Sequence, residues 1–300
     1  MTSPYEAAVL HWYASNARDL PWRNPDATPW SIMVSEFMLQ QTPVSRVLPA
    51  HAAWLARWPL PAALAEASPA DAIRQWDRLG YPRRAVRLHA AASLIVSQHD
   101  GQVPAAIEAL RELPGVGSYT AAAIASFAFG GRHAVLDTNV RRVLTRLIRG
   151  EGLPPRAPTA AELRLAESLL PRDGGQAARW SVAVMELGAL VCTATRPRCT
   201  SCPVAAQCAW LRLDRPPSPP RPGQAAYHGS DRQCRGALLA VLRSAAGAVP
   251  AGRLAVAWHD SAQRTRALAA LVSDGLAIRY DDGSAALAGD DPSATRGAVG

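Results

Sequence analysis

The sequence predicts an all-α protein that ends in a small winged-helix-like module. Apolar residues recur at helical spacing through the first two thirds of the 300 residues, and no alternating strand pattern occurs before residue 235. The connections between these patterns are short and rich in Gly and Pro, as in helical bundles. Hydrophobic residues make up 49% of the chain, which is enough for the cores of two domains.

The helices of the first two thirds are expected between clear break points. Thr42 is expected to cap a helix that begins at Pro43, because the residue before a proline is driven out of the α region. The expected helices cover residues 5–17, 30–41, 43–57, a turn around 64, 69–79, 83–98, 103–110, 120–127, 140–147 and 180–190.

The last third of the chain changes character at residues 214–233. Residues 215–223 read RPPSPPRPG, which predicts a stiff, extended, basic linker. Beyond the linker, residues 234–290 are expected to form a separate module, followed by a tail at 291–300. The module shows helical patterns at 236–245, 251–257 and 262–273, then two short strand patterns, 276–280 and 285–287, around Asp281-Asp282-Gly283. Three helices and a hairpin predict a winged helix, although a small packing domain without a ligand fits the same pattern.

The charge balance favours a polyanionic partner. The net charge is +8, and all 32 basic residues are arginine. A GC-rich coding bias also explains the missing lysine, but its absence still removes every ε-amine that Schiff-base chemistry requires. No signal peptide opens the chain, and no apolar run approaches the roughly 18 residues of a membrane helix. We therefore expect a soluble cytoplasmic protein, associated with the nucleoid through DNA, with no membrane partner.

Residues 113–120, LPGVGSYT, join two helical patterns. Pro114 and Gly115 end the first helix, and Gly117 is expected to let the backbone turn into the second. The N–H groups of this turn lie at a helix N-terminus and form an anion site, for which a DNA phosphate is the natural ligand. This assigns the hairpin residues Leu113, Gly115, Val116 and Gly117 to DNA binding, against the alternative of an ordinary turn between helices.

Four of the five cysteines fall in one short segment. Cys192, Cys199, Cys202 and Cys208 have the spacing C-x6-C-x2-C-x5-C, which suits either a zinc ion or an iron–sulfur cluster. Zinc sites usually contain two C-x2-C pairs, and the longer gaps here suit a wider four-iron cluster, so both alternatives stay open on spacing alone. Cys234, beyond the linker, is expected to be a free thiol.

Two carboxylates have surroundings that suit acid–base chemistry. Glu36 lies inside an apolar helical pattern, where its pKa would rise and the group could serve as a general acid. An exposed position on a polar stripe is the alternative. Asp137 follows three apolar residues and precedes the arginine-rich pattern 140–147. Its alternative role is an N-cap.

Together, the hairpin, the segment VLDTNV at 135–140 and the cysteine spacing resemble the endonuclease III superfamily of helix-hairpin-helix DNA glycosylases. Residues 35–42, SEFMLQQT, closely resemble the signature of its adenine-specific family, and the match runs from about residue 5 to 212. The resemblance implies a monomer with a substrate groove between two lobes. The lobes are a six-helix barrel at 22–135 and an iron–sulfur cluster lobe built from the N-terminal helix 1–21 and residues 136–213. It also implies a [4Fe–4S] cluster on the four cysteines.

The resemblance further implies a monofunctional adenine glycosylase of base excision repair. Its substrate is double-stranded DNA containing adenine opposite 8-oxoguanine or guanine, with the adenine flipped into a pocket. Glu36 would protonate the adenine, and Asp137 would stabilise the oxocarbenium-like sugar. Tyr119 and Asn139 match positions that support these two carboxylates.

The same resemblance assigns residues to the two bases of the mispair. Trp22, Arg23 and Glu186 match positions that line the adenine pocket. Gln41 and Tyr81 match residues inserted near the partner base, where they compensate for lost stacking.

Two differences from the superfamily shape these expectations. Its lyase branch has a catalytic lysine where this chain has Tyr119, and this chain contains no lysine at all. Many adenine glycosylases also carry a C-terminal domain resembling Nudix hydrolases that reads 8-oxoguanine, whereas about 90 residues follow Cys208 here. We expect the winged-helix-like module and the basic linker to contact DNA in its place. A mismatch glycosylase for another base such as thymine, and a non-catalytic iron–sulfur DNA-binding protein, are the alternative functions.

Overall fold

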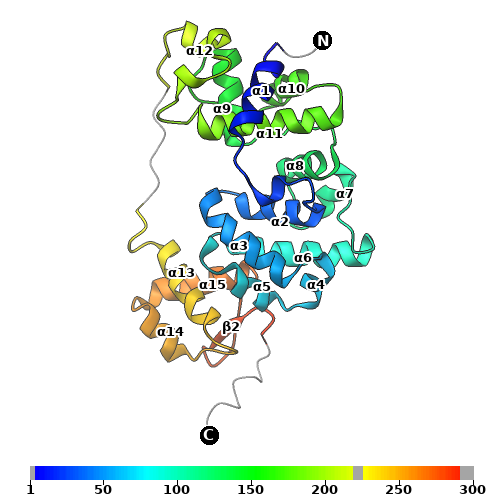
Figure 1. Ribbon diagram of the computed structural model, residues 1–300. Helices are drawn as coiled ribbons and strands as arrows, with labels where there is room; N and C mark the ends of the chain where they lie inside the picture. The colour runs from blue at the N-terminus through cyan, green and yellow to red at the C-terminus, as the bar shows by residue number, and fades with distance from the viewer. Residues whose placement is uncertain (1–3, 219–225, 291–300) are drawn as a thin grey trace. The chain divides into compact units, whose positions relative to one another are not determined.

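The computed structural model describes residues 4–218 and 226–290, and these are almost entirely helical (Figure 1). The chain forms two compact units. The first unit contains residues 1–36, 104–112 and 116–221, and the second contains 37–103, 113–115 and 222–300. Most of the predicted linker proline run, from residue 219, and the predicted tail lie outside the described residues. No described helix is both long and apolar enough to cross a bilayer.

The core of the first unit forms between its N-terminal helix and three later ones. Val9, Val143, Trp180 and Leu187 are buried together in this core. Besides the first part of α2, the helices of this unit are α1 (Glu6–Asn16), α7 (Ile107–Glu112), α8 (Ser118–Phe129), α9 (Thr138–Leu144), a π-helical continuation (Thr145–Arg149), α10 (Ala160–Leu169), α11 (Gly174–Leu190) and α12 (Ala209–Arg212), with 3-10 turns at Pro21–Arg23, Cys199–Ser201 and Ala205–Gln207.

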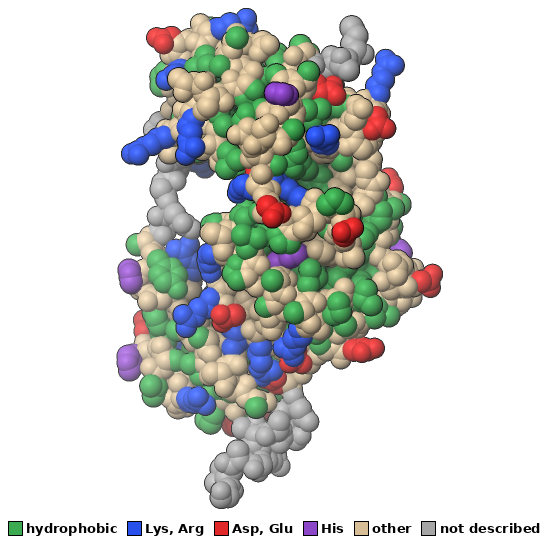
Figure 2. All heavy atoms as spheres, in the orientation of Figure 1, with side chains coloured by type: hydrophobic (Ala, Val, Ile, Leu, Met, Phe, Trp, Pro, Cys, Tyr) green, Lys and Arg blue, Asp and Glu red, His purple; other side chains and the backbone are tan. Residues whose placement is uncertain are grey.

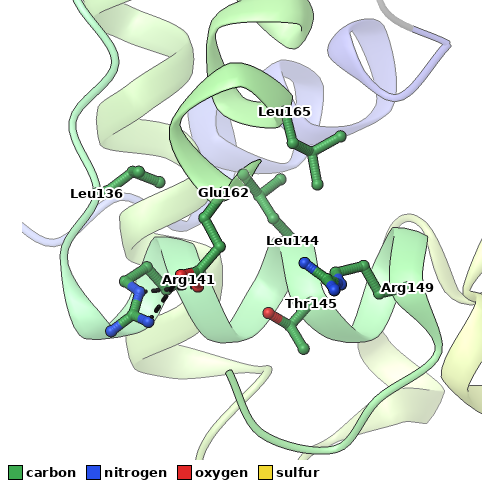
Figure 3. A pocket seen from close by; sticks show the side chains of 7 residues that line it. All are labelled: Leu136, Arg141, Leu144, Thr145, Arg149, Glu162 and Leu165. Atoms are coloured by element: carbon green, nitrogen blue, oxygen red, sulfur yellow. Dashed lines mark hydrogen bonds and ion pairs between the residues drawn. The ribbon is translucent and has the colours of Figure 1, made fainter. Parts of the chain in front are cut away.

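Helices α9 and α10 are tied by a buried ion pair, shown in Figure 3. The Arg141 guanidinium donates from Nε and Nη2 to the Glu162 carboxylate, at 2.9 Å each, and both side chains are at most 6% exposed. Glu162 also completes a capping box with Thr159 at the start of α10. The small cavity beside this pair, lined by Leu136, Leu144, Thr145, Arg149 and Leu165, therefore belongs to a structural joint. The ion pair fixes α9 in place, one helical turn after Asp137.

The second unit begins with the end of α2 (Pro29–Leu39). It continues through α3 (Val44–Arg57), α4 (Pro61–Glu66), α5 (Pro69–Trp76), a 3-10 turn (Asp77–Leu79) and α6 (Arg83–Gln98). Trp54 packs edge-on against Trp58 and Trp76, with ring centroids 4.7 and 5.5 Å apart. The prediction that Thr42 caps α3 is wrong: the helix starts at Val44 behind Pro43, and the Thr42 hydroxyl accepts a hydrogen bond from Arg84 instead.

The C-terminal module, residues 231–290, contains the predicted elements in the predicted order. They are α13 (Asp231–Arg243), α14 (Ala251–Ala257), α15 (Ser261–Ser273), β1 (Ala277–Arg279) and β2 (Ala285–Leu287). The two strands pair antiparallel, with Ala277 opposite Leu287. Cys234 is a buried thiol in the core of the module, as expected for a free cysteine. This core extends onto α5 through Ala70 and Ile73, so the module is not a separate body.

The hairpin between α7 and α8 turns at a different glycine from the one predicted. Gly115 has φ +85°, and a Cβ there would lie 2.8 Å from the Cβ of Arg87 and 2.9 Å from the Phe37 ring. Gly117 has φ −85° and open space around it, so the assignment of the tight turn to Gly117 is wrong. Because Leu113 and Val116 are buried, the hairpin offers a ligand its backbone rather than these side chains.

Candidate active site and cysteine cluster

Glu36 is buried, because α2 has no polar face. Every residue from Trp30 to Met38 is buried, and only Ser31, Ser35 and Glu36 among them are polar. Glu36 itself is 5% exposed. The alternative of an exposed polar stripe is therefore wrong.

The surroundings of Glu36 suit a proton donor at neutral pH. Its pKa is raised to about 7, first by burial and also by the charge of Asp137, while a hydrogen bond with the Tyr119 hydroxyl and the charge of Arg23 oppose the shift. Burial and the two carboxylates also raise the pKa of Tyr119 well above its ordinary value, so its hydroxyl keeps its proton. The structure thus brings Glu36, Tyr119 and Asp137 together.

Asp137 has the N-cap role that was considered as the alternative for it. Its Oδ1 accepts a hydrogen bond from the Val140 N–H at 2.6 Å, which caps α9. Its Oδ2 accepts one from the Asn139 amide, also at 2.6 Å. Burial raises the pKa of this carboxyl, and these hydrogen bonds limit the rise. The side chain is half-buried, and its charge acts on Glu36 and Tyr119, so the capping carboxylate lies near both groups.

Glu186 is held by two arginines. Arg18 donates to both carboxylate oxygens, at 2.7 and 2.8 Å, and Arg23 donates to Oε2 at 2.9 Å. Although burial opposes it, these bonds lower the pKa of Glu186 to about 2. The second Arg23 nitrogen, Nη1, is buried and finds no acceptor among residues 4–218 and 226–290, and Trp22 beside it is also buried. The two N–H groups of Arg23 Nη1 therefore stay available for a ligand.

Gln41 and Tyr81 lie in the second unit, and both have left-handed backbone conformations, with φ of +56° and +47°. Arg84 supports both turns from the start of α6. It donates to the carbonyls of Gln40 and Gly80, at 2.7 and 2.9 Å, while its own side chain is buried. The Tyr81 ring is 53% exposed. Both residues are thus presented on strained turns that a buried arginine holds.

The four cysteines of the C-x6-C-x2-C-x5-C segment line one cavity, together with Arg146 and Trp210. Burial raises the pKa of Cys202 to about 11, so this thiol loses its proton at neutral pH only to a metal. No three His, Cys, Asp or Glu side chains in the described parts of the chain are placed to hold one metal ion. The four thiols that line this cavity are a soft donor set of the kind that binds zinc or an iron–sulfur cluster.

Arg142 connects the cysteine segment to Asp137. Its guanidinium donates to the backbone carbonyl of Cys192 at 2.6 Å and to the Asn139 side-chain oxygen at 2.8 Å. It also donates to the carbonyl of Gly188 at 2.7 Å, where a Cβ would lie 2.6 Å from the Cβ of Asn139. The glycine lets α11 approach α9 closely, and the arginine ties Asn139, the partner of Asp137, to the first cysteine.

Sequence reasoning missed the half-buried Arg18 and the buried Arg84 and Arg142. Each binds groups that lie far away in the chain or on neighbouring turns, and the chain contains many arginines with no distinguishing local pattern. Figure 2 shows arginine side chains over much of one face, among hydrophobic and polar ones, which agrees with the positive net charge.

Comparisons with known proteins give the family. The model of the HhH-GPD superfamily of base excision DNA repair proteins matches residues 34–168. An adenine DNA glycosylase of Mycobacterium tuberculosis is 52% identical over 94% of this chain and 93% of its own length, and one of Mycolicibacterium smegmatis is 48% identical over 96% and 97%. The human adenine DNA glycosylase is 40% identical over 68% of this chain, which is 39% of that protein.

Solved structures show the same fold. A thermostable thymine-DNA glycosylase has a TM-score of 0.63 and 27% identity, covering 70% of this chain and 95% of that one. An endonuclease III trapped covalently on DNA has a TM-score of 0.59 at 19% identity, covering 69% and 94%, and indicates the fold alone. By these relatives, this chain belongs to the HhH-GPD superfamily of base excision DNA repair proteins and, within it, to the family of the adenine DNA glycosylases.

Proposed function

We propose that this chain is a monofunctional DNA glycosylase that removes adenine mispaired with 8-oxoguanine or guanine. The observation that carries the proposal is the buried Glu36, whose pKa lies at about 7 and whose carboxyl is hydrogen-bonded to Tyr119 near Asp137. The family membership supplies the DNA substrate and the base. Two carboxyl groups in different environments are the arrangement that glycosidic bond hydrolysis requires.

In this mechanism Glu36 donates its proton to N7 of the flipped adenine. The bond between C1′ of the sugar and N9 of the base then breaks, and its electron pair leaves with the adenine. Positive charge develops on the sugar, where the ionised Asp137 stabilises it or captures it transiently. A water molecule adds to C1′, any bond from C1′ to the Asp137 carboxylate breaks with its electron pair returning to the carboxylate, and the proton of the water passes to the ionised Glu36. The products are an abasic site and free adenine.

The missing lysine determines the fate of the abasic site. A lyase forms an imine between a primary amine and the sugar aldehyde, and the chain has no ε-amine to do so. Tyr119 instead donates its hydroxyl hydrogen to Glu36. We therefore propose that strand cleavage needs added alkali.

The pocket residues Trp22, Arg23 and Glu186 would bind the adenine. The unpaired Nη1 of Arg23 is a donor suited to a ring nitrogen of the base. The ion pair with Glu186 keeps the arginine in place. The backbone of the Leu113–Gly117 hairpin would bind a phosphate at the N-terminus of α8. Gln41 and Tyr81 would enter the duplex beside the partner base.

We also propose that Cys192, Cys199, Cys202 and Cys208 hold a [4Fe–4S] cluster. The shared cavity, the long gaps of the C-x6-C-x2-C-x5-C spacing and the family membership support this cofactor. The cluster would cross-link the segment 192–208. Analysis of the purified protein should find about four iron and four sulfide per chain, and zinc without sulfide would contradict the assignment.

The experiment that tests the function uses three duplexes, with adenine opposite 8-oxoguanine, adenine opposite guanine, and thymine opposite guanine. Alkali-dependent cleavage at adenine, lost in Glu36→Gln, is the expected result. The ratio of the two adenine rates measures how strongly 8-oxoguanine is preferred. Cleavage confined to thymine would instead identify a thymine mismatch glycosylase, and folded protein without any excision would identify a DNA-binding protein.

A further inference from the structure

The loop between α5 and α6, residues 77–82, is a strained segment of the second unit. Asp77, Gly80 and Tyr81 have φ of +42°, +91° and +47°. Residues other than glycine rarely adopt such backbone angles. Strained angles of this kind persist only where the surrounding structure holds the backbone. This segment, which we call the Tyr81 loop, therefore depends on the contacts of its backbone.

The middle of the Tyr81 loop is held from its own barrel helices. The Gly80 carbonyl accepts hydrogen bonds from Trp76 Nε1 and Arg84 Nη2, both at 2.9 Å. The Thr42 hydroxyl donates to the Leu79 carbonyl at 3.4 Å. Arg46 of α3 donates to the Arg78 carbonyl, and the Arg84 N–H donates to the Tyr81 carbonyl at 3.1 Å. These contacts leave the Asp77 carbonyl and the Arg83 side chain, which flank the loop, to other partners.

The C-terminal module holds both ends. Arg243, the last residue of α13, donates from Nη1 to the backbone carbonyl of Asp77 and lies 3.5 Å from its carboxylate. The Arg243 side chain is 14% exposed and the Asp77 side chain 72%, so a covered arginine meets a partner at the surface. At the other end, Asp274 pairs through Oδ1 with Arg83, the first residue of α6, at 3.2 Å, and Arg235 of α13 pairs with its Oδ2.

The module can act on the loop because it is fixed to α5. Ile73 and Ala70 of α5 are buried in the module core. Arg74 donates to the carbonyl of Ala245 at 2.8 Å and to Asp290 at 2.7 Å. A Cβ at Gly289 would lie 2.7 Å from Pro69, which shows how closely the module backbone approaches the helix.

We infer that Arg243 and Asp274 are positioning residues for excision, and that the C-terminal module braces the Tyr81 loop so that the exposed Tyr81 ring enters the duplex beside the partner base. This inference rests on the proposed function. It gives the module a role that works through the barrel, rather than through a DNA surface of its own. The ring would unstack the partner base, and bracing would keep the free protein in the inserting conformation.

The test is a double-mutant cycle on the full chain, using single-turnover excision of adenine opposite 8-oxoguanine. Arg243→Met is expected to lower the rate about fivefold to tenfold, the effect of one partly covered charge-assisted hydrogen bond. Tyr81→Ala is expected to lower it as well. In the Tyr81→Ala background, Arg243→Met should have no further effect, because the arginine acts through that ring. Equal rate losses with and without Tyr81 would overturn the inference.

A matched control separates bracing from general electrostatics. Arg253, an exposed arginine of α14 that makes none of these contacts, loses the same charge in Arg253→Met. This variant should excise adenine at the rate of the unmodified chain, and Arg243→Lys should recover most of the rate. If Arg253→Met were as slow as Arg243→Met, the module would act on DNA through its charge and the bracing would be refuted.

A second readout does not depend on excision. When the protein binds a duplex that carries 2-aminopurine as the partner base, insertion of Tyr81 should raise the fluorescence of the 2-aminopurine. Arg243→Met and, independently, Asp274→Asn should each lose most of that rise while still binding the duplex and unfolding cooperatively on heating. An undiminished rise in both variants would contradict the bracing. A chain that shows the rise but releases no adenine would instead contradict the proposed function.

Discussion

The pH dependence of adenine excision follows from the surroundings of Glu36. As proton donor, this carboxyl must be protonated, and its pKa lies at about 7 because burial disfavours the charged form. The protonated fraction falls from about 0.9 at pH 6 to about 0.1 at pH 8. The single-turnover rate should therefore fall about tenfold over that interval, and about tenfold more for each further pH unit. At acid pH the rate should also decline, because Asp137 must be ionised and burial raises its pKa.

Tyr119→Phe tests the origin of this profile. The tyrosine hydrogen bond stabilises the charged form of Glu36 and lowers its pKa, so the variant should move the alkaline limb to higher pH. The assay is single-turnover excision from a duplex with adenine opposite 8-oxoguanine, followed by alkali, from about pH 5 to 9.5. A rate that stays constant from pH 6 to 9, or an alkaline limb that moves to lower pH in Tyr119→Phe, would refute the assignment of Glu36 as the acid.

Three further predictions concern stability and coupling. Glu36→Gln should raise the free energy of unfolding at pH 8 by about 3 kcal/mol, since the carboxyl pKa lies at about 7 in the folded chain against 4.5 in water. Below pH 4 the two proteins should unfold at equal urea concentration, and a gain that is independent of pH would contradict the linkage. Arg142→Gln should slow excision about tenfold or more, because Asn139 then loses the partner that holds it against Asp137; unchanged single-turnover rates would show that Asn139 needs no such support. Ile73→Ala should cost about 2 to 5 kcal/mol in urea unfolding, as for a fully buried isoleucine, and unfolding of the C-terminal module alone would contradict a core shared with α5.

The secondary structure of the chain was largely predictable, because its signals are local. The helix expected at 83–98 is α6, Arg83–Gln98, and the strand expected at 285–287 is β2. Periodicity and break points decide such elements without reference to the rest of the chain. The end of α2 was placed two residues late because Gln41 adopts a left-handed turn that Arg84 supports from another helix.

The candidate site was predictable only in part. The resemblance named Glu36 and Asp137, but the sequence alone favoured a structural role for each carboxylate over a catalytic one. The environment of Glu36 depends on Tyr119 and Asp137, which lie 83 and 101 positions away in the chain. The effect of such neighbours on a pKa requires the folded structure.

The remaining features depend on long-range contacts of arginine. Arg142 reaches Cys192 and Arg243 reaches Asp77, and neither partner has a local pattern that indicates the pairing. The packing of the C-terminal module onto α5 could not be predicted either. Ala70 and Ile73 are apolar residues on one face of a helix, and this pattern does not indicate which core they are buried in. A proline-rich linker indicates a boundary in sequence but does not indicate which surface the module beyond it covers.

The central claim is that Glu36 donates the proton that releases adenine, and the most direct measurement is the released base itself. Free adenine should be quantified chromatographically from a duplex carrying adenine opposite 8-oxoguanine, with the unmodified chain and with Glu36→Gln. We expect one adenine per abasic site for the unmodified chain and a rate lowered at least about 100-fold in the variant, the lower range for loss of a general acid. Release of adenine at an equal rate by Glu36→Gln would contradict the claim.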